Sequence, residues 1–343
     1  MNGKNEDLKI AVVGAGAIGG ICAAFISRAG YDVEVAVRRD EHAQAVRERG
    51  IRVTGVKGEF TAKLPAVADV GEMSEDRDLV LLGIKATAMA DVAEQLAGRI
   101  GPDTAVVSLQ NGFCEDALAE ILGRERVVGC VTGWGATMHS DTELEMTSFG
   151  DFIIGNIDNR PDPRLEGMKE VLDHVLETRI SENITGSLYS KLIINSCITS
   201  VGAVCGLYLG QMLAQKQVRL IFLAIMEEAM AVARAMDIRV EVFAGKLDYY
   251  TFTASRGLLG DVKRHAFLRI MGFKYRRLKS SSLQSLERGR RTEIDYLTGY
   301  ITSKGRALSV PTPVNDRIRS IVREIEAGRR DISPDNIADI LLA

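Results

Sequence analysis

Two polar side chains interrupt an otherwise apolar stretch, and their spacing places them together. In SLYSKLIINSCITS, residues 187–200, Lys191 and Asn195 lie four positions apart among leucines, isoleucines and a cysteine. On a helix this spacing stacks both side chains on one face. A buried, unpaired lysine is energetically costly, whereas a partly desolvated lysine has a lowered pKa and becomes a better proton donor near neutral pH. Lys191 and Asn195 are therefore candidate functional residues.

A carboxylate in a second polar stretch is another candidate. Glu293 follows SSSLQSLERGRRT, residues 280–292, and precedes an apolar run. Taken alone, this position favours a carboxylate at a helix start, where it interacts with the helix dipole. A catalytic role is the alternative that the residue type leaves open.

The strongest local signal is a glycine motif near the N-terminus. Gly14, Gly16 and Gly19 form G-x-G-x-x-G between the apolar run 8–13 and a helical pattern, and a second apolar run, 33–37, follows. This strand–turn–helix–strand context is typical of a Rossmann-type dinucleotide site rather than of a merely structural glycine turn.

Each glycine has a mechanical role in such a unit. Gly14 makes the tight turn, Gly16 lets the backbone approach a pyrophosphate, and Gly19 lets the helix pack close to the strand. The helix N-terminus, with Ala17 and Ile18 in its first turn, faces the anion.

The residues after the second strand indicate which dinucleotide binds. An acidic residue there would bind the ribose 2′-hydroxyl of NAD, whereas arginine accommodates the 2′-phosphate of NADP. The sequence reads Val37-Arg38-Arg39-Asp40, so NADPH is favoured. The alternative is that both arginines are solvated loop charges.

Two further strand ends carry polar residues. Lys85 ends the apolar run 78–86, and Gln110 and Asn111 end the run 104–112. Ligands of open α/β sheets bind beyond the carboxyl ends of the strands, so these side chains are candidate cofactor or substrate contacts.

The pattern of apolar residues changes near residue 183 and divides the chain into two domains. Further strands at 127–136 and 152–156 complete an α/β domain over 1–183, and helical periods dominate an all-helical domain over 184–343. The helical patterns cover 187–205, 216–236, 280–305 and 313–327. Pro313 lies at a plausible helix start and Gly328 at a stop. A helical domain after a dinucleotide fold usually carries the substrate side of the site, and this one is a candidate for dimerisation.

Composition narrows the class of protein. The chain has 343 residues, 46% hydrophobic and 26% charged, with a net charge of −3, which gives no general case for nucleic acid or an anionic membrane. The polar N-terminus predicts no signal peptide, and the apolar stretch 188–209 carries too many polar residues for a membrane span.

The odd number of cysteines, without a CxxC motif, favours reduced thiols in a cytoplasmic protein. No histidine has metal-ligand spacing, so we predict no metal.

The motifs GAGAIGG, IKA, LQNG, KLIIN and SSSLQSLERGRRTEID, in this order, resemble the ketopantoate reductases (2-dehydropantoate 2-reductases). The resemblance extends from about Lys9 to Glu326. It implies a Rossmann domain for NADPH, a helical domain that closes over a 2-oxo acid, and reduction of 2-dehydropantoate to pantoate in pantothenate biosynthesis.

The resemblance also implies roles for the polar residues of the helical half. Lys191 matches the general acid that protonates the ketone oxygen, Asn195 a substrate-binding asparagine, Ser282 a serine that holds the substrate carboxylate, and Glu293 the acidic residue of the site. In the first half, Asn111 matches a contact near nicotinamide and substrate. Lys85 matches a cofactor-side lysine, and Arg38 the arginine near the 2′-phosphate.

Three positions depart from the family pattern. Thr199 and Leu209 stand where the family often has asparagine, and Ser285 where it usually has aspartate. We keep Thr199 as a substrate-side residue. Because lost hydrogen-bonding groups alter selection strongly, the reaction type is better predicted than the substrate.

An additional segment, 246–279, is basic. Its charged or titratable side chains are Arg256, Lys263, Arg264, His265, Arg269, Lys274, Arg276, Arg277 and Lys279. A solvated helical hairpin or a dimer contact is one interpretation, and an electropositive lid that favours a more anionic substrate is the other.

Three functions remain open from the sequence. The first is an NADPH-dependent 2-oxo acid reductase acting on ketopantoate. The second is a related oxidoreductase for another 2-oxo or 2-hydroxy acid. The third is a non-catalytic NADP-sensing protein, against which the retention of Lys191 and Glu293 argues.

Overall fold

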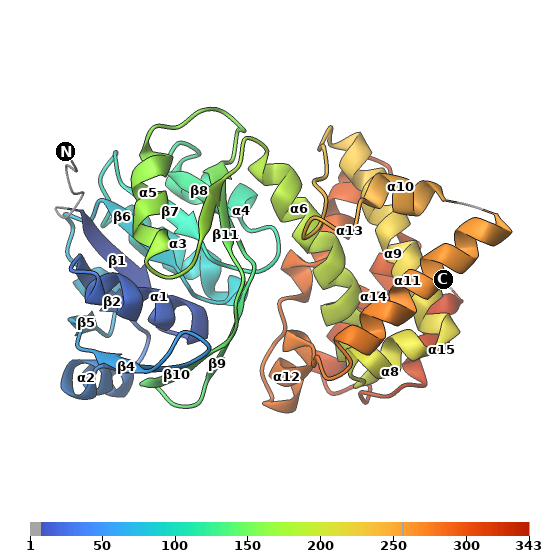
Figure 1. Cartoon of the computed structure of the whole chain (residues 1–343), viewed down its shortest axis with the longest axis horizontal. Helices are drawn as coiled ribbons and strands as arrows, with labels where there is room; N and C mark the ends of the chain where they lie inside the picture. The colour runs from blue at the N-terminus through green and yellow to red at the C-terminus, as the bar shows by residue number, and fades with distance from the viewer. Residues whose placement is uncertain (1–7, 256, 343) are drawn as a thin grey trace. The chain divides into compact units, whose positions relative to one another are not determined.

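The computed structural model describes residues 8–255 and 257–342. Within it the chain forms two compact units, Met1–Thr185 and Gly186–Ala343 (Figure 1). Arg256, one of the basic residues of the additional segment, lies outside the described residues, as does the polar N-terminal stretch 1–7.

The first unit is built on an eight-stranded sheet. Its strand order is β12-β11-β8-β7-β6-β1-β2-β5. The strands are β1 (Lys9–Val13), β2 (Asp32–Ala36), β5 (Ala66–Val67), β6 (Leu79–Leu82), β7 (Ala105–Ser108), β8 (Val127–Thr132), β11 (Phe152–Asn156) and β12 (Thr178–Ile180). Every pair is parallel except β8 with β11. The α/β fold class predicted from the sequence is confirmed.

Buried apolar side chains explain the position of these strands. β1 lies between β2 and β6, with Val12 opposite Val35 on one side and Leu81 on the other. All three are fully buried, as expected for parallel strands covered on both faces by helices. The helices of this unit are α1 (Ala17–Arg28), α2 (Asp40–Arg49), α3 (Met89–Ala97), α4 (Glu115–Leu122) and α5 (Arg164–Asp173), with short 3₁₀ turns η1 (Val70–Glu72) and η2 (Ala86–Ala88).

A second, four-stranded sheet was not predicted. Its order is β4-β3-β10-β9, formed by β3 (Ile51–Gly55), β4 (Phe60–Ala62), β9 (Gly135–Met138) and β10 (Glu143–Ser148). The predicted strand 127–136 is therefore two strands in different sheets. Gly133 and Trp134 lie between the two strands, and a Cβ on Gly133 would meet Asp151 Oδ1 at 2.6 Å.

The second unit is helical. Its elements are α6 (Ile184–Asn195, which begins two residues inside the first unit), the π-helical turn η3 (Ser196–Ser200), α7 (Val201–Cys205), α8 (Leu209–Ala214), α9 (Lys216–Ala235), α10 (Tyr249–Ala254), α11 (Leu258–Lys274), α12 (Ser281–Glu287), the 3₁₀ turn η4 (Ile294–Tyr296), α13 (Thr298–Ala307), α14 (Pro313–Glu326) and α15 (Asn336–Leu341). Pro313 begins α14, as predicted, and Gly328 follows its end with a φ of +67°.

Two predicted helices are interrupted. The expected helix 187–205 contains a π-helical turn at Ser196–Ser200. The expected helix 280–305 was wrong as a single element, because α12 ends before Gly289, whose φ is +64°. A left-handed residue cannot continue an α-helix, and a run of arginines follows it.

Within residues 8–255 and 257–342, one helical stretch is long and apolar enough to cross a membrane. It is Ile184–Cys205, and 78% of its most apolar window is buried inside the protein. This burial agrees with its prediction as a core helix. All five cysteines are buried and none is joined in a disulfide within the described residues.

Candidate functional site

The glycine turn between β1 and α1 is held by close backbone contacts. Gly14 has a φ of +96° and donates its N–H to the Ala36 carbonyl at 2.8 Å. A Cβ on Gly19 would collide with the Gly14 carbonyl oxygen, and Gly83 Cα lies only 3.3 Å from that point. Gly14 and Gly19 therefore permit the turn and the close packing of α1 on the sheet.

Gly16 has a different environment. It is the N-cap residue of α1. Apart from its chain neighbours and its own helix, no atom of the described residues lies within 4 Å of the position that a Cβ would occupy. No side chain caps the helix and its first turn has no acidic residue. The N–H groups of this turn, which includes Ala17 and Ile18, are thus suited to an anion, and the open space beside Gly16 suits a pyrophosphate.

The two arginines after β2 differ in their partners. Both side chains are exposed, but Arg39 forms a hydrogen-bonded ion pair with Asp141 in the β9–β10 turn. Among the described residues, no hydrogen bond or ion pair engages Arg38. Arg38 is therefore the better candidate for a 2′-phosphate.

Lys85 and Asn111 lie at the carboxyl ends of neighbouring strands. Lys85 follows β6 and precedes η2, Asn111 follows β7, and both are exposed. β6 and β7 are adjacent and parallel, so both residues lie at the same edge of the sheet as Gly14. Gln110, next to Asn111, is instead buried, and its amide has no hydrogen-bond partner in the part of the chain that the structure describes.

Glu115 is a buried carboxylate in the first turn of α4. One carboxylate oxygen accepts a hydrogen bond of 3.0 Å from the Cys114 backbone N–H, at the end of the loop that begins with Asn111. Burial raises the Glu115 pKa to about 7, although backbone N–H groups and the Ser108 hydroxyl oppose the shift. The sequence analysis missed this residue, and its only signal was an acidic side chain at a helix start.

In the helical unit, Lys191 and Asn195 lie on one face of α6. Both are half-buried, whereas Leu192 and Ile193 are buried in the core. The π-helical turn begins immediately after Asn195, and Thr199 within it is buried. Single π-helical turns inside α-helices are frequent at functional sites. The sequence predicted the shared face of Lys191 and Asn195 but not this turn.

Two buried tyrosines fix the backbone beside Lys191. The Tyr189 hydroxyl donates to the Ala229 carbonyl of α9 at 2.9 Å. The Tyr249 hydroxyl donates to the Ser190 carbonyl at 2.8 Å. Because both phenols are almost fully buried, these hydrogen bonds hold the Lys191 segment against two other helices.

Glu293 lies in the chain between two polar residues, Thr292 and Asp295, that bond to other parts of the helical unit. It is the N-cap residue of the 3₁₀ turn η4, so it stands at a helix start as predicted, although its side chain accepts no capping hydrogen bond from that turn. The Thr292 hydroxyl accepts a hydrogen bond of 3.2 Å from the Ile294 N–H and donates one of 2.7 Å to the Glu326 carboxylate. The Asp295 carboxylate forms ion pairs with Arg319 and Arg323. The neighbouring polar groups thus stabilise the fold, and Glu293 is half-buried between them.

The remaining substrate-side candidates are buried. Ser282, in α12, is 3% exposed, and Leu209 begins α8 in the core. The Ser285 hydroxyl donates to the Ser281 carbonyl of its own helix at 3.0 Å, and this serine lacks the negative charge that an aspartate would carry.

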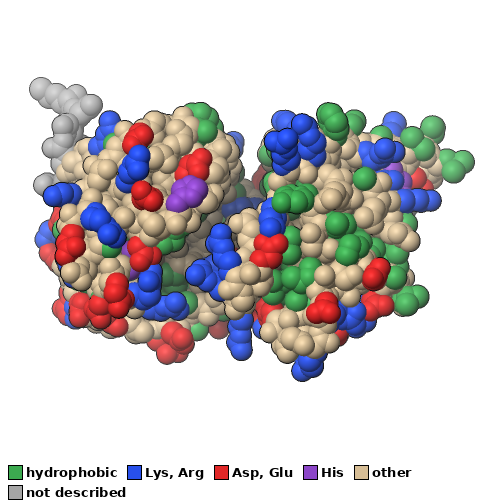
Figure 2. Space-filling view, turned by 90° about the horizontal axis from the view of Figure 1, so that it is seen from below, with side chains coloured by type: hydrophobic (Ala, Val, Ile, Leu, Met, Phe, Trp, Pro, Cys, Tyr) green, Lys and Arg blue, Asp and Glu red, His purple; other side chains and the backbone are tan. Residues whose placement is uncertain are grey.

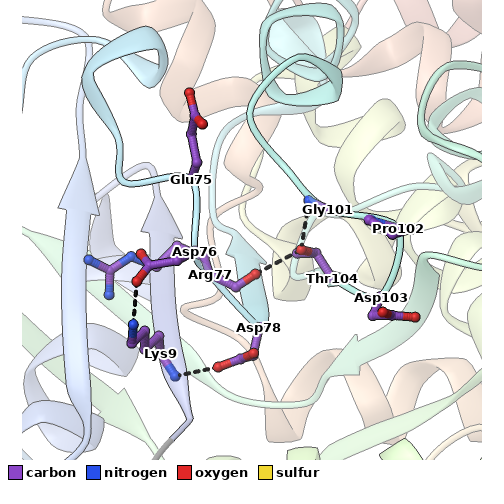
Figure 3. Close-up of a pocket in the computed structure, with 9 residues that line it drawn as sticks. All are labelled: Lys9, Glu75, Asp76, Arg77, Asp78, Gly101, Pro102, Asp103 and Thr104. Carbon is purple, nitrogen blue, oxygen red and sulfur yellow. Dashed lines mark hydrogen bonds and ion pairs between the residues drawn. The ribbon is translucent and has the colours of Figure 1, made fainter.

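An open pocket of about 480 Å³ lies at the opposite edge of the first sheet (Figure 3). It is lined by Lys9, Asp78 and Thr104, next to the amino ends of β1, β6 and β7. None of the predicted site residues lines it. Among the described residues, no group of three His, Cys, Asp or Glu side chains could hold a metal ion.

A mostly parallel sheet with a glycine turn at its carboxyl edge is typical of a dinucleotide-binding protein, and a helical unit with a half-buried lysine follows it in this chain. The family model described as "Ketopantoate reductase PanE/ApbA" matches residues 10–159, and that described as "Ketopantoate reductase PanE/ApbA C terminal" matches residues 183–326. The chain belongs to the ketopantoate reductase family and is an oxidoreductase of that family.

Individual relatives agree with this assignment. A 2-dehydropantoate 2-reductase of Archaeoglobus fulgidus is 29% identical over 93% of this chain and 98% of its own length. The crystal structure of a PanE/ApbA family ketopantoate reductase from Ralstonia eutropha JMP134 is 27% identical, with a TM-score of 0.80 over 94% of this chain and 100% of its own. A D-mandelate dehydrogenase bound to NADH and anilino(oxo)acetate is 24% identical, with a TM-score of 0.77 over 94% of this chain and 99% of its own, which shows the shared fold.

Proposed function

We propose that this protein reduces a 2-oxo acid to a 2-hydroxy acid with NADPH, with 2-dehydropantoate as the first substrate to test. The observation that carries the proposal is the shared half-buried face of Lys191 and Asn195. Family membership supports the reaction type, and a role in pantothenate biosynthesis would follow from that substrate.

The residues of the first unit fit a dinucleotide phosphate. The uncapped first turn of α1 and the space beside Gly16 would hold the pyrophosphate, and Arg38 would bind the 2′-phosphate. Lys85 and Asn111 would contact the cofactor at the same sheet edge. When bound, the dihydronicotinamide supplies the hydride.

The residues of the helical unit supply the acid and the substrate contacts. Reduction of a ketone builds negative charge on its oxygen, which an ammonium group stabilises and then protonates. Lys191 takes this role, and Asn195, one turn on, binds the substrate. Ser282 and Thr199 provide further substrate-side hydroxyls, and Glu293 is the acidic residue of the site.

Steady-state oxidation of NADPH against a panel of 2-oxo acids tests the proposal. Turnover of at least one 2-oxo acid, abolished by Lys191→Ala, is the expected result. A protein that binds NADPH but turns over no member of a broad panel would instead support the non-catalytic alternative.

A different 2-oxo or 2-hydroxy acid is a second candidate substrate. Leu209 offers no hydrogen bond, and the Ser285 hydroxyl is engaged by its own helix. We therefore expect poor turnover of ketopantoate relative to another 2-oxo acid. A kcat/KM for ketopantoate far above that of every other panel member would contradict this substrate assignment without affecting the proposed reaction.

A further inference from the structure

Helix α11 leaves an unusual number of large apolar side chains uncovered. Leu259 is 80% exposed, Val262 and Ile270 are each 65% exposed, and Phe273 is 75% exposed. Leu258, at the start of the helix, is also exposed. Figure 2 shows exposed hydrophobic side chains on the helical unit. Isolated exposed apolar residues are normal, but a contiguous group on one helix is characteristic of an interaction surface.

The opposite face of α11 accounts for its packing within the unit. Gly272 contacts α8 so closely that a Cβ would lie 2.7 Å from the Leu213 side chain. Arg264 is buried and pairs with Glu227 of α9 and with Asp261. The helix is therefore anchored through one face, and Arg264 is not one of the solvated charges expected for this segment.

The exposed residues form one stripe. Residues 259, 262, 266, 270 and 273 recur with spacings of three, four, four and three. At about 100° per residue they fall within a sector of about 80°. We call these five residues, which include the exposed Ala266, the α11 stripe.

The spacing of the α11 stripe is symmetric about Ala266. If two copies of α11 pack antiparallel across a two-fold axis at this residue, Val262 faces Ile270 of the other copy and Leu259 faces Phe273. Every apolar side chain then meets an apolar partner, and the small alanine permits close approach at the centre. In a two-fold homodimer the same surface of both copies meets, so that surface must be complementary to itself, as the α11 stripe is.

We propose that the α11 stripe is the homodimer interface of this protein, with α11 packed antiparallel on its copy about Ala266. This assigns the basic segment to a dimer contact, one of the two interpretations of its sequence. The exposed Tyr250, Tyr275 and Leu278 on adjoining segments are available to extend the interface. A single helix of about 25 Å needs such additions to approach the 800 Å² or so that each partner of a typical stable dimer buries.

An anionic lipid surface is the main alternative occupant, because Lys263 and Arg269 flank the stripe. A membrane responds to total apolar area and charge, so the symmetric spacing would have no consequence there. Ionic strength separates the two. In the antiparallel pair Lys263 lies near Arg269 of the other copy, so salt should strengthen dimerisation, whereas it would weaken vesicle binding.

Sedimentation equilibrium of the full chain tests the interface. The wild-type protein should be dimeric at micromolar concentrations. Val262→Glu with Ile270→Glu places like charges opposite one another, which should raise the dissociation constant by at least about 100-fold. Val262→Lys with Ile270→Glu places opposite charges together and should restore much of the affinity. Phe149→Glu, at a 63% exposed residue of the first unit, is the matched control and should remain dimeric.

A cysteine crosslink tests the register. Ala266→Cys should give a covalent dimer under mild oxidation, because the two copies meet at this residue and the five native cysteines are buried. Ala97→Cys, exposed on α3, should not. A monomeric wild-type protein, a dimer that survives Val262→Glu with Ile270→Glu, or binding to anionic vesicles without dimerisation would each overturn the proposal. These results are independent of reductase activity.

Discussion

The hydroxyl of Tyr249 donates a hydrogen bond of 2.8 Å to the backbone carbonyl of Ser190, the residue immediately before Lys191. Both partners are buried, so this bond joins α10 to the middle of α6 in a region without competing water. Tyr189 makes a similar bond from α6 to the Ala229 carbonyl of α9. The backbone that carries the proposed acid is thus held at two adjacent residues.

Tyr249→Phe should therefore affect turnover as well as stability. Loss of the hydroxyl removes one buried hydrogen bond, worth about 1 kcal/mol, and loosens the helix beside Lys191. We expect a lower kcat with unchanged NADPH affinity. Tyr250→Phe is the control, because the Tyr250 hydroxyl accepts a hydrogen bond of 3.1 Å from the Val240 N–H, remote in sequence from Lys191. Equal kcat values for the two variants would contradict a positioning role for Tyr249.

Arg38→Ala should weaken NADPH binding and leave NADH binding nearly unchanged. One charge-assisted hydrogen bond to a phosphate contributes roughly 1.5–3 kcal/mol, or about 10- to 150-fold in the dissociation constant. Arg39→Ala should have a smaller effect, because Arg39 is engaged by Asp141. Fluorescence titration with both cofactors measures the ratio. If the two constants change equally, Arg38 does not bind the 2′-phosphate.

Gly16→Ala should lower cofactor affinity with little effect on stability, whereas Gly19→Ala should lower stability. At Gly16 a methyl group meets no protein atom, so stability should change by no more than about 0.5 kcal/mol. Cofactor affinity should fall by roughly 5- to 150-fold, the equivalent of about 1–3 kcal/mol of overpacking. At Gly19 the methyl group collides with the Gly14 carbonyl, so the unfolding temperature should fall. A destabilised Gly16→Ala with normal affinity would contradict the pyrophosphate site.

Glu115→Gln should gain stability relative to wild type as the pH rises. The unfolded chain releases this proton near pH 4.5, whereas the folded protein holds it to about pH 7. The folded state therefore binds more protons in this window, and the Glu115 contribution to the free energy of unfolding falls across it. The cost above pH 7 is about 3 kcal/mol. Urea unfolding at pH 5 and pH 8 measures the difference, and a variant with a constant offset would contradict the raised pKa.

Features with local signatures were predicted well from the sequence. Gly14, Gly16 and Gly19 follow an apolar strand, and their geometric requirements are local to that turn. Lys191 and Asn195 share a face because helical periodicity alone places residues four apart together. Pro313 and Gly328 mark helix ends for equally local reasons.

Features that depend on distant contacts were not predicted. Strand β10 pairs with β3, about 90 residues earlier in the chain, and its residues Glu143–Ser148 lack a long apolar run. The π-helical turn after Asn195 has no residue signature of its own. Glu115 acquires its raised pKa from burial among segments that the sequence does not show to be neighbours.

The variant Lys191→Ala tests the central claim most directly, with kcat, NADPH affinity and unfolding temperature measured on one preparation. We predict a folded protein with nearly unchanged NADPH affinity and a kcat lowered by about 10²- to 10⁴-fold, the usual contribution of a positioned acid. Lys191→Arg should not restore turnover, because guanidinium remains protonated and its planar fork cannot take the same position. A folded Lys191→Ala variant that binds NADPH and turns over near the wild-type rate would remove Lys191 from the mechanism.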